Sequence, residues 1–181
     1  MREEKVIILK QEQFIKTFLK ISLHRIYNLY FAKFKISLTS IGKEQLWKSE
    51  NNSNSIGGII LHLCEHIRMS ELNLKRRDDK FRDDFVIYFP IEDLKPMELI
   101  ERFELQINDW RQSIIPYIND EIRLSEEDVH DLYNLVEHMS YHLGQVIDKI
   151  QSMTGIKFNF YENGLNERYL RDQIESNVEK D

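Results

Sequence analysis

The sequence predicts an all-α protein, a four-helix bundle with a long crossover between its second and third helices and a short helix near the C-terminus. In four long segments of the 181-residue chain, apolar residues recur at spacings of three and four, which is the period of an amphipathic helix. The chain has only 6 Gly and 3 Pro, a composition typical of long helices with few tight turns. A chain of this length fits one hydrophobic core, so we expect a single domain over residues 1–181.

The first helix is predicted over about residues 11–35, where charged residues alternate with a regular apolar face. This face consists of Phe14, Ile15, Phe18, Leu19, Ile26 and Leu29. Residues 36–53 contain Gly42 and several Ser and Asn residues, which disfavour a continued helix. We therefore expect a connection there, with one helical turn around residues 44–47.

The second helix begins where Asn54 or Ser55 can act as its N-cap. It should end near Lys75 and bury an apolar face made of Ile56, Ile59, Ile60, Leu63, Ile67 and Leu74. Residues 75–90 are first charged and then aromatic, and a connection of this length favours a crossover that spans the bundle. Its apolar part, residues 85–89, could alternatively form a short extended piece.

The third and fourth helices are bounded by recognisable start and stop signals. The third is predicted to begin near Asp93 and to end at Pro116. The fourth begins at Ser125, which opens a sequence resembling a capping box, and ends at Gly155. A short and mostly polar helix over residues 165–177 is expected to follow.

Composition excludes several classes of function. The net charge is -6 and the basic residues are scattered, so we expect no nucleic-acid partner. Cys64 is the single cysteine, which rules out an intrachain disulfide and favours a cytoplasmic location. The apolar run Val6–Leu9 is too short for a secretory signal, and no run approaches the roughly 20 apolar residues of a membrane span. We therefore expect neither export nor membrane insertion.

Four of the six histidines form two pairs at i, i+4 spacing, His62 with His66 and His138 with His142. Residues four apart lie one above the other on a helix, so two imidazoles can point at one ion. Each pair borders the apolar face of its helix, and bundles hold their metal ions between such faces. Two pairs on different helices therefore favour a divalent-metal site, whereas a single pair would more often be ordinary packing.

The residues around these pairs resemble the signature stretches of the DinB-like superfamily, also called YfiT-like metal-dependent hydrolases. The stretches are Asn-Ser-Ile-Gly at 54–57 with His62-Leu63, and His-Met-Ser-Tyr-His-Leu-Gly-Gln at 138–145. The resemblance covers nearly the whole chain in order and spacing, and its most specific part is the second stretch. It implies a four-helix bundle that binds one divalent metal ion, here through His62, His138 and His142.

The resemblance also implies an activity. Relatives in this superfamily include transferases and isomerases that use low-molecular-weight thiols such as bacillithiol or mycothiol. We therefore expect a metal-dependent thiol S-transferase, or a hydrolase that activates water, with zinc or nickel as cofactor and a small-molecule thiol or electrophile as partner. Homodimerisation is common in the family. The alternative is a noncatalytic, stress-associated bundle that the ion only stabilises.

Five other residues lie near the predicted ligands in the sequence, and each has its own expected role. His66 has no family role, and it can serve in packing, in orienting a ligand, or as a fourth ligand that closes the site. Gln145 and Glu137 are candidates for orienting the ligands, while Tyr141 is not expected to be a general acid. Cys64 lies on another side of its helix and is interpreted as a buried thiol.

Three arginines and two further metal-binding motifs offer alternative interpretations of this sequence. Arg68, Arg76 and Arg77 could bind a carboxylated thiol, but a solvated charged face explains them equally well. Residues 62–66 also fit the H-x-x-E-H string of zinc peptidases with Glu65 as base, which would leave the second histidine pair unexplained. A di-iron bundle needs two E-x-x-H motifs, and only Glu127 with His130 fits. His24 and His130 are expected to be ordinary core or boundary residues.

Overall fold

A computed structural model describes residues 2–49, 53–76 and 87–176. Within these ranges the regular elements are all helical and no strand occurs, which confirms the predicted all-α class. The helices pack together around one continuous set of buried apolar side chains. In chain order they are α1 (Arg2–His24), the π-helical segment η1 (Arg25–Tyr30), α2 (Phe31–Leu38), α3 (Lys43–Trp47), α4 (Ile56–Leu74), α5 (Pro96–Ile118), α6 (Glu126–Thr154) and α7 (Glu167–Ser176).

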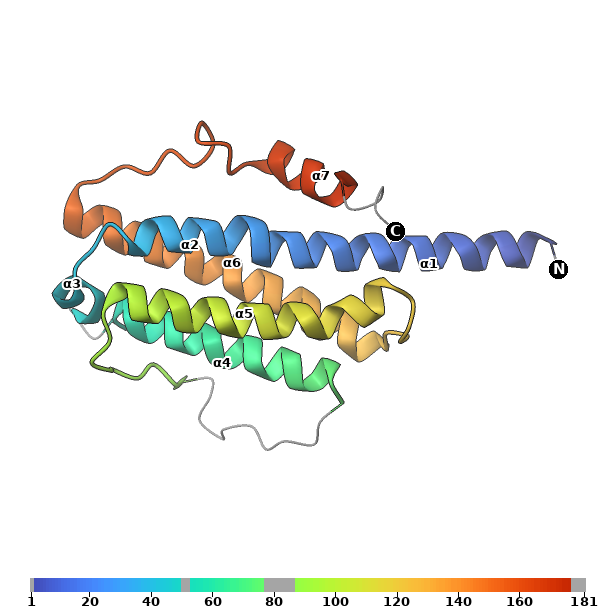
Figure 1. Ribbon diagram of the computed structural model, residues 1–181, viewed down its shortest axis with the longest axis horizontal. Coiled ribbons are helices and arrows are strands. Elements are labelled where there is room, and N and C mark those ends of the chain that lie inside the picture. The colour runs from blue at the N-terminus through green and yellow to red at the C-terminus, as the bar shows by residue number, and fades with distance from the viewer. Residues whose placement is uncertain (1, 50–52, 77–86, 177–181) are drawn as a thin grey trace.

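The first rod, made of α1, η1 and α2, is longer than the predicted helix at both ends. Part of its predicted apolar face is wrong, because Phe14 is 76% exposed and Ile15 is 40% exposed, whereas Leu19 and Ile26 are buried. Figure 1 shows that the N-terminal end of α1 extends past the other helices, and Ile15 borders a cleft that Tyr117 and Leu124 also line. Periodicity identifies an apolar face, but burial also requires a neighbour.

The histidine-bearing helices α4 and α6 lie against each other, and α4 also packs along α5. The rod closes the other side, with α1 against α5 and α2 against α6. Large side chains from all of these helices fill the space between them and are almost fully buried. They include Ile26, Phe34, Ile60, Phe103, Trp110, Met139 and Ile150. The two histidine helices are thus held side by side by a packed core.

Helix boundaries follow the predicted signals in most places. Ser55 is the N-cap of α4 and accepts a hydrogen bond from the amide of Gly58. Ser125 and Asp128 form the capping box of α6, and Gly155 ends this helix with a left-handed φ of 73°. The two boundaries of α5 differ from the prediction, because Lys95 is the cap and the helix continues through Pro116 to Ile118. A proline near the end removes one helical hydrogen bond without forcing the chain out of a helical φ.

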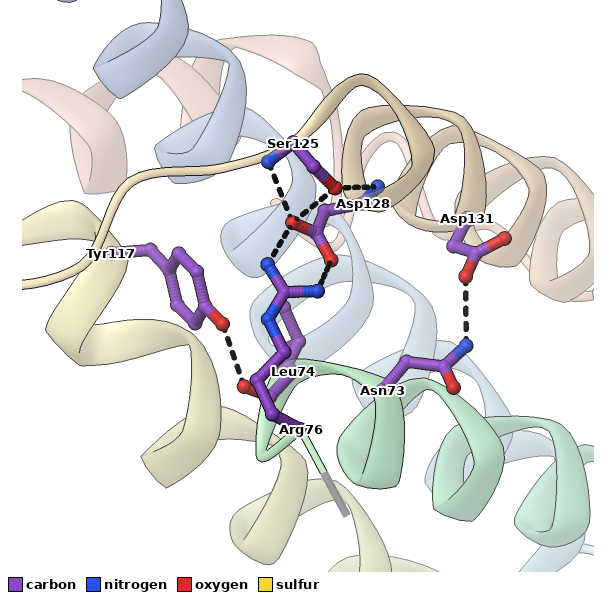
Figure 2. Close-up of polar contacts among 7 residues, drawn as sticks. All are labelled: Asn73, Leu74, Arg76, Tyr117, Ser125, Asp128 and Asp131. Carbon is purple, nitrogen blue, oxygen red and sulfur yellow. Dashed lines mark hydrogen bonds and ion pairs between the residues drawn. The ribbon is translucent and has the colours of Figure 1, made fainter. Parts of the chain in front are cut away.

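The end of α4 is tied to the start of α6 by the contacts in Figure 2. Arg76 donates two hydrogen bonds to the carboxylate of Asp128, at 2.7 and 2.6 Å. The side chain of Asn73 donates to Asp131 at 2.7 Å. Three residues forward along α4 thus correspond to three residues backward along α6, so the two helices run antiparallel.

Two predictions concern segments that give little structural information. The crossover over residues 75–90 falls mainly on residues 77–86, which lie outside the described ranges. Of the extended piece considered for residues 85–89, residues 87–89 are described and form no strand. In the described chain, no helix has the length and apolar character needed to cross a membrane. The predicted terminal helix is present as α7.

Candidate metal centre

The structure brings His62 of α4 together with His138 and His142 of α6. One ring nitrogen from each of the three histidines can be chosen so that all lie within 4.8 Å of one another. His62 and His142 are buried, and His138 is half-buried at the side of the cluster. Three histidines from segments more than seventy residues apart therefore meet at one point between two helices, and this group could hold a metal ion.

The spacing of the nitrogens suits a divalent ion. The Nε2 atoms of His62 and His138 lie 2.9 Å apart. Nitrogen ligands about 2.0 to 2.1 Å from a tetrahedral zinc ion lie about 3.3 Å from each other. The distance between the Nε2 atoms of His62 and His138 is slightly below this value, and the 4.8 Å upper limit on the nitrogen distances within the group is above it. Small side-chain adjustments would therefore produce a normal coordination geometry.

His142 is oriented by a short chain of hydrogen bonds along α6. Its Nδ1 lies 2.7 Å from Oε1 of Gln145, and an amide oxygen can only accept, so Nδ1 carries the proton. This leaves the lone pair of Nε2 of His142 available to a metal ion. The amide nitrogen of Gln145 in turn donates to the hydroxyl of Tyr141 at 2.9 Å. Gln145 thus has the orienting role expected for it, and Tyr141 contacts Gln145 through its hydroxyl.

Three histidines of the stretches that carry the resemblance to the DinB-like superfamily therefore lie together in space. Comparisons of the chain with protein families, curated proteins and solved structures find no match. Membership of the superfamily accordingly stays a prediction. The case for a metal site depends on the geometry and chemistry of this chain alone.

Burial keeps the clustered imidazoles in the neutral form that metals require. Burial, with the neighbouring rings of His142 and His62, lowers the pKa of His138 to about 4. Burial also lowers the pKa of His142, and the hydrogen bond to Gln145 opposes this effect in part. The lowered pKa values of His138 and His142 favour uncharged rings at neutral pH, each with a lone pair that can bind a metal ion.

His66 lies against the cluster without belonging to the group of three. Its ring centroid is 4.0 Å from that of His138 and 4.5 Å from that of His62. Burial, and to a smaller extent the three neighbouring imidazole rings, lowers the pKa of His66 to about 3. His66 is thus a neutral neighbour of the centre. It is also one of the described residues that line a cleft between α4 and α6.

Phe89 is a site residue that the sequence did not reveal. Its ring stacks on the imidazole of His62 with centroids 4.2 Å apart and planes 22° apart, and it lies 6.2 Å from the ring of His142. The backbone of this segment passes so close to Gly58 that a Cβ atom there would be 3.3 Å from the carbonyl oxygen of Phe89. The aromatic run before Pro90 was the one available signal, but no spacing rule relates it to a histidine on another segment.

Gly57 supports the same end of α4 in a different way. A side chain at this position would overlap the indole ring of Trp47, whose Nε1 donates to the carbonyl of Leu94 at 2.8 Å. The small residues of the Ser-Ile-Gly-Gly stretch therefore let α3 and the segment before α5 pack onto the helix that carries His62.

Other predicted residues lie away from the centre or are engaged elsewhere. Cys64 is buried, and burial raises the pKa of its thiol to about 12, as expected for an inert thiol. Glu137 is exposed, and the described contacts do not connect it to the histidines. Glu65 accepts two hydrogen bonds from Arg68, at 2.7 and 3.0 Å, which disfavours it as a peptidase base. Arg77 lies outside the described residues.

Of the remaining two histidines, His24 is the core residue expected, whereas the expectation of a core or boundary position is wrong for His130. His24 is buried, and its Nδ1 lies 2.8 Å from Oδ1 of Asn28. His130 is exposed on α6. Arg76, which was considered as an anion-binding residue, is engaged with Asp128 at the far end of the helix pair.

Proposed function

We propose that this protein is a metal-dependent enzyme of the DinB-like type, which uses one divalent ion, zinc or nickel, to activate a small thiol or water. The observation that carries the proposal is the convergence of His62, His138 and His142 with ligand atoms within 4.8 Å of one another. The fold inferred with it is the four-helix bundle of that superfamily, with the crossover between α4 and α5.

An ion held by three neutral imidazoles keeps its full charge and an open position, and so supplies a thiolate or hydroxide nucleophile at neutral pH. The residues around it have complementary tasks. Gln145 holds His142 in one tautomer. Phe89 covers the face of His62 and keeps water from it. Thiol activation is the leading mechanism because the resemblance implies it, and Cys64 is too strongly protonated to replace an external thiol.

A second candidate function is a structural metal site, and the position of His66 favours it. A ring 4.0 Å from that of His138 could turn to become the fourth ligand. Structural zinc sites are closed by four protein ligands, whereas catalytic sites keep one position open. The two functions therefore differ in whether a small molecule can bind the ion.

The first experiment is metal analysis of the purified protein beside His62→Ala and His138→Ala. We expect about one divalent ion per chain in the wild-type protein and loss of that ion in both variants. His130→Ala, on the exposed face of α6, is the matched control and should retain the metal. Stoichiometric metal in either of the first two variants would refute the site.

The second experiment separates the catalytic from the structural role. Cobalt-substituted protein is titrated with low-molecular-weight thiols, and a sulfur-to-cobalt charge-transfer band is expected where a position is open. Transfer of the same thiols to a chromogenic electrophile is then measured. An unchanged spectrum, together with no transfer and no hydrolysis, would support the structural role and contradict the enzymatic one.

A further inference from the structure

A cleft of about 350 Å³ lies between α4 and α6, and among the four clustered histidines it is His66 that lines it. His66 forms one end of it, and the ring of His66 is in turn 4.0 Å from that of His138. From there the cleft continues along the two helices toward Asn73 and Asp131. A larger cleft of about 420 Å³ lies between α1 and the turn before α6 and contains none of the histidines.

The antiparallel register sets the length of the space beside the centre. Asn73 is seven residues beyond His66 on α4, and Asp131 is seven residues before His138 on α6. Seven residues correspond to about 10 Å of helix. A molecule with one end at the histidine group and the other beside Asp131 would therefore be extended and about 10 Å long.

The lining of the cleft has a definite chemical character. Met69 and Leu135 supply apolar surface, and the other described lining residues beyond His66 are polar: Ser70, Asn73, Asp131 and Asn134. Among the described lining residues, Asp131 supplies the charge. Asn73 donates to Oδ2 of this carboxylate (Figure 2), and a carboxylate has two oxygens with about four acceptor positions. The far end of the cleft is thus rich in acceptors and negatively charged.

Two described cations just after α4, Lys75 and Arg76, are engaged with other carboxylates. Arg76 binds Asp128 through both of its terminal nitrogens, and Lys75 binds Glu71 at 2.5 Å. Asp131 is half-buried beside its amide partner. A carboxylate in this position is suited to a cation delivered by a ligand, because partial burial strengthens the attraction relative to open solvent.

We propose that this cleft binds the substrate of the metal centre, and that the substrate is an extended small molecule with a protonated amine about 10 Å from its reactive atom. The amine donates to Asp131, the chain lies along Met69 and Leu135, and the reactive atom lies at the histidine group. This inference rests on the proposed function, since it assigns the substrate class of the same centre.

The test uses two chelating probes with the same six-carbon chain, 6-aminohexanohydroxamic acid and hexanohydroxamic acid. Both carry a hydroxamate that binds zinc, and they differ in ending in an ammonium or a methyl group. Their affinities for the full-length, zinc-loaded protein are measured by isothermal titration calorimetry. The amine-ended probe should bind about five- to tenfold more tightly, as expected for a partly buried charged hydrogen bond.

Asp131→Asn is the decisive variant, because it keeps an acceptor for Asn73 while removing the charge. It should abolish the preference for the amine and leave the affinity for the methyl-ended probe unchanged. Asp148→Asn removes the same charge from an exposed position farther along α6 and should leave the preference intact. Circular dichroism melting curves confirm that both variants are folded.

The outcomes separate this inference from the proposed function. Equal binding of both probes to the wild-type protein, or a preference that survives in Asp131→Asn, would overturn the substrate assignment and leave the metal centre in place. Failure of both probes to bind the zinc-loaded protein would show that the ion has no open position. That result would overturn the enzymatic proposal and this inference with it.

Discussion

Replacement of Gln145 by leucine tests whether the hydrogen bond to His142 prepares the centre for its ion. The amide oxygen of Gln145 lies 2.7 Å from Nδ1 of His142 and so selects the tautomer in which Nε2 is free. Leucine has a similar size but no acceptor. In Gln145→Leu the ring can rotate or exchange its proton position, and both changes must be reversed when the metal binds.

The expected loss is about 10- to 100-fold in metal affinity, or about 1.4 to 2.8 kcal/mol. The short bond and the burial of His142 favour the upper half of this range. Tyr141 should matter less, because its side chain is 63% exposed and water can replace its hydroxyl as the partner of Gln145. We expect a change of about threefold or less for Tyr141→Phe.

Affinity is measured by competition with a chromogenic chelator at fixed pH, with circular dichroism to verify the fold. Gln145→Glu is the conservative control. Its carboxylate still accepts from Nδ1 and makes the imidazole a better donor to the metal, so affinity should be retained or increased. If Gln145→Leu and the wild-type protein hold the ion equally well, then the hydrogen bond does not orient a ligand.

Other predictions concern stability and reactivity. Gly57→Ala should destabilise the fold by about 1 to 3 kcal/mol, because the new methyl group overlaps Trp47. Gly144→Ala, in open space on α6, should leave the stability unchanged or raise it by up to about 1 kcal/mol. Denaturant titrations measure the free energy of unfolding of both variants. Burial alone would raise the pKa of Asp128, but its hydrogen bonds from arginine and serine lower it below its ordinary value, so Asp128→Asn should cost about 1 to 2 kcal/mol at pH 7. That stabilisation is present above the unfolded pKa and is lost as pH falls through the folded pKa, so the difference in melting temperature from wild type should shrink below about pH 4. Cys64, with its pKa raised to about 12 by burial, should react with iodoacetamide only after denaturation, as followed by mass spectrometry.

Each of these results can contradict the structure. Equal stabilities of the two glycine variants would mean that the indole ring does not lie against α4. A stability difference for Asp128→Asn that is the same at pH 3 and pH 7 would exclude an ionised carboxylate as its source. Rapid labelling of the native thiol would place Cys64 at the surface.

Much of the fold was predictable because helix formation depends on local sequence. The apolar period located α4, α5 and α6, and the caps at Ser55 and Ser125 placed two of their starts within a residue. Errors arose where a local signal needed a tertiary partner. Phe14 belongs to a regular apolar face and is nevertheless 76% exposed, because periodicity does not determine whether another segment covers that face.

At the candidate site, too, some features followed from the local sequence and others depended on tertiary packing. Spacing alone showed that each histidine pair shares one side of its helix, since this is a property of 3.6 residues per turn. It did not determine that His66 would lie beside the cluster while His62 entered it, or that Gln145 rather than Glu137 would orient a ligand. Those outcomes depend on how α4 and α6 are rotated and shifted against each other.

The sequence by itself determined that the chain is helical, where α4, α5 and α6 lie along it, and which histidines can point the same way. Only the tertiary structure decided that His62 and His138 meet at 2.9 Å, that Phe89 stacks on His62, and that the cleft beside His66 extends to Asp131. The physical reason is that helical periodicity is set within a few residues of chain. The rotation and register of two helices are instead set by the packing of side chains from distant segments, which no local pattern encodes.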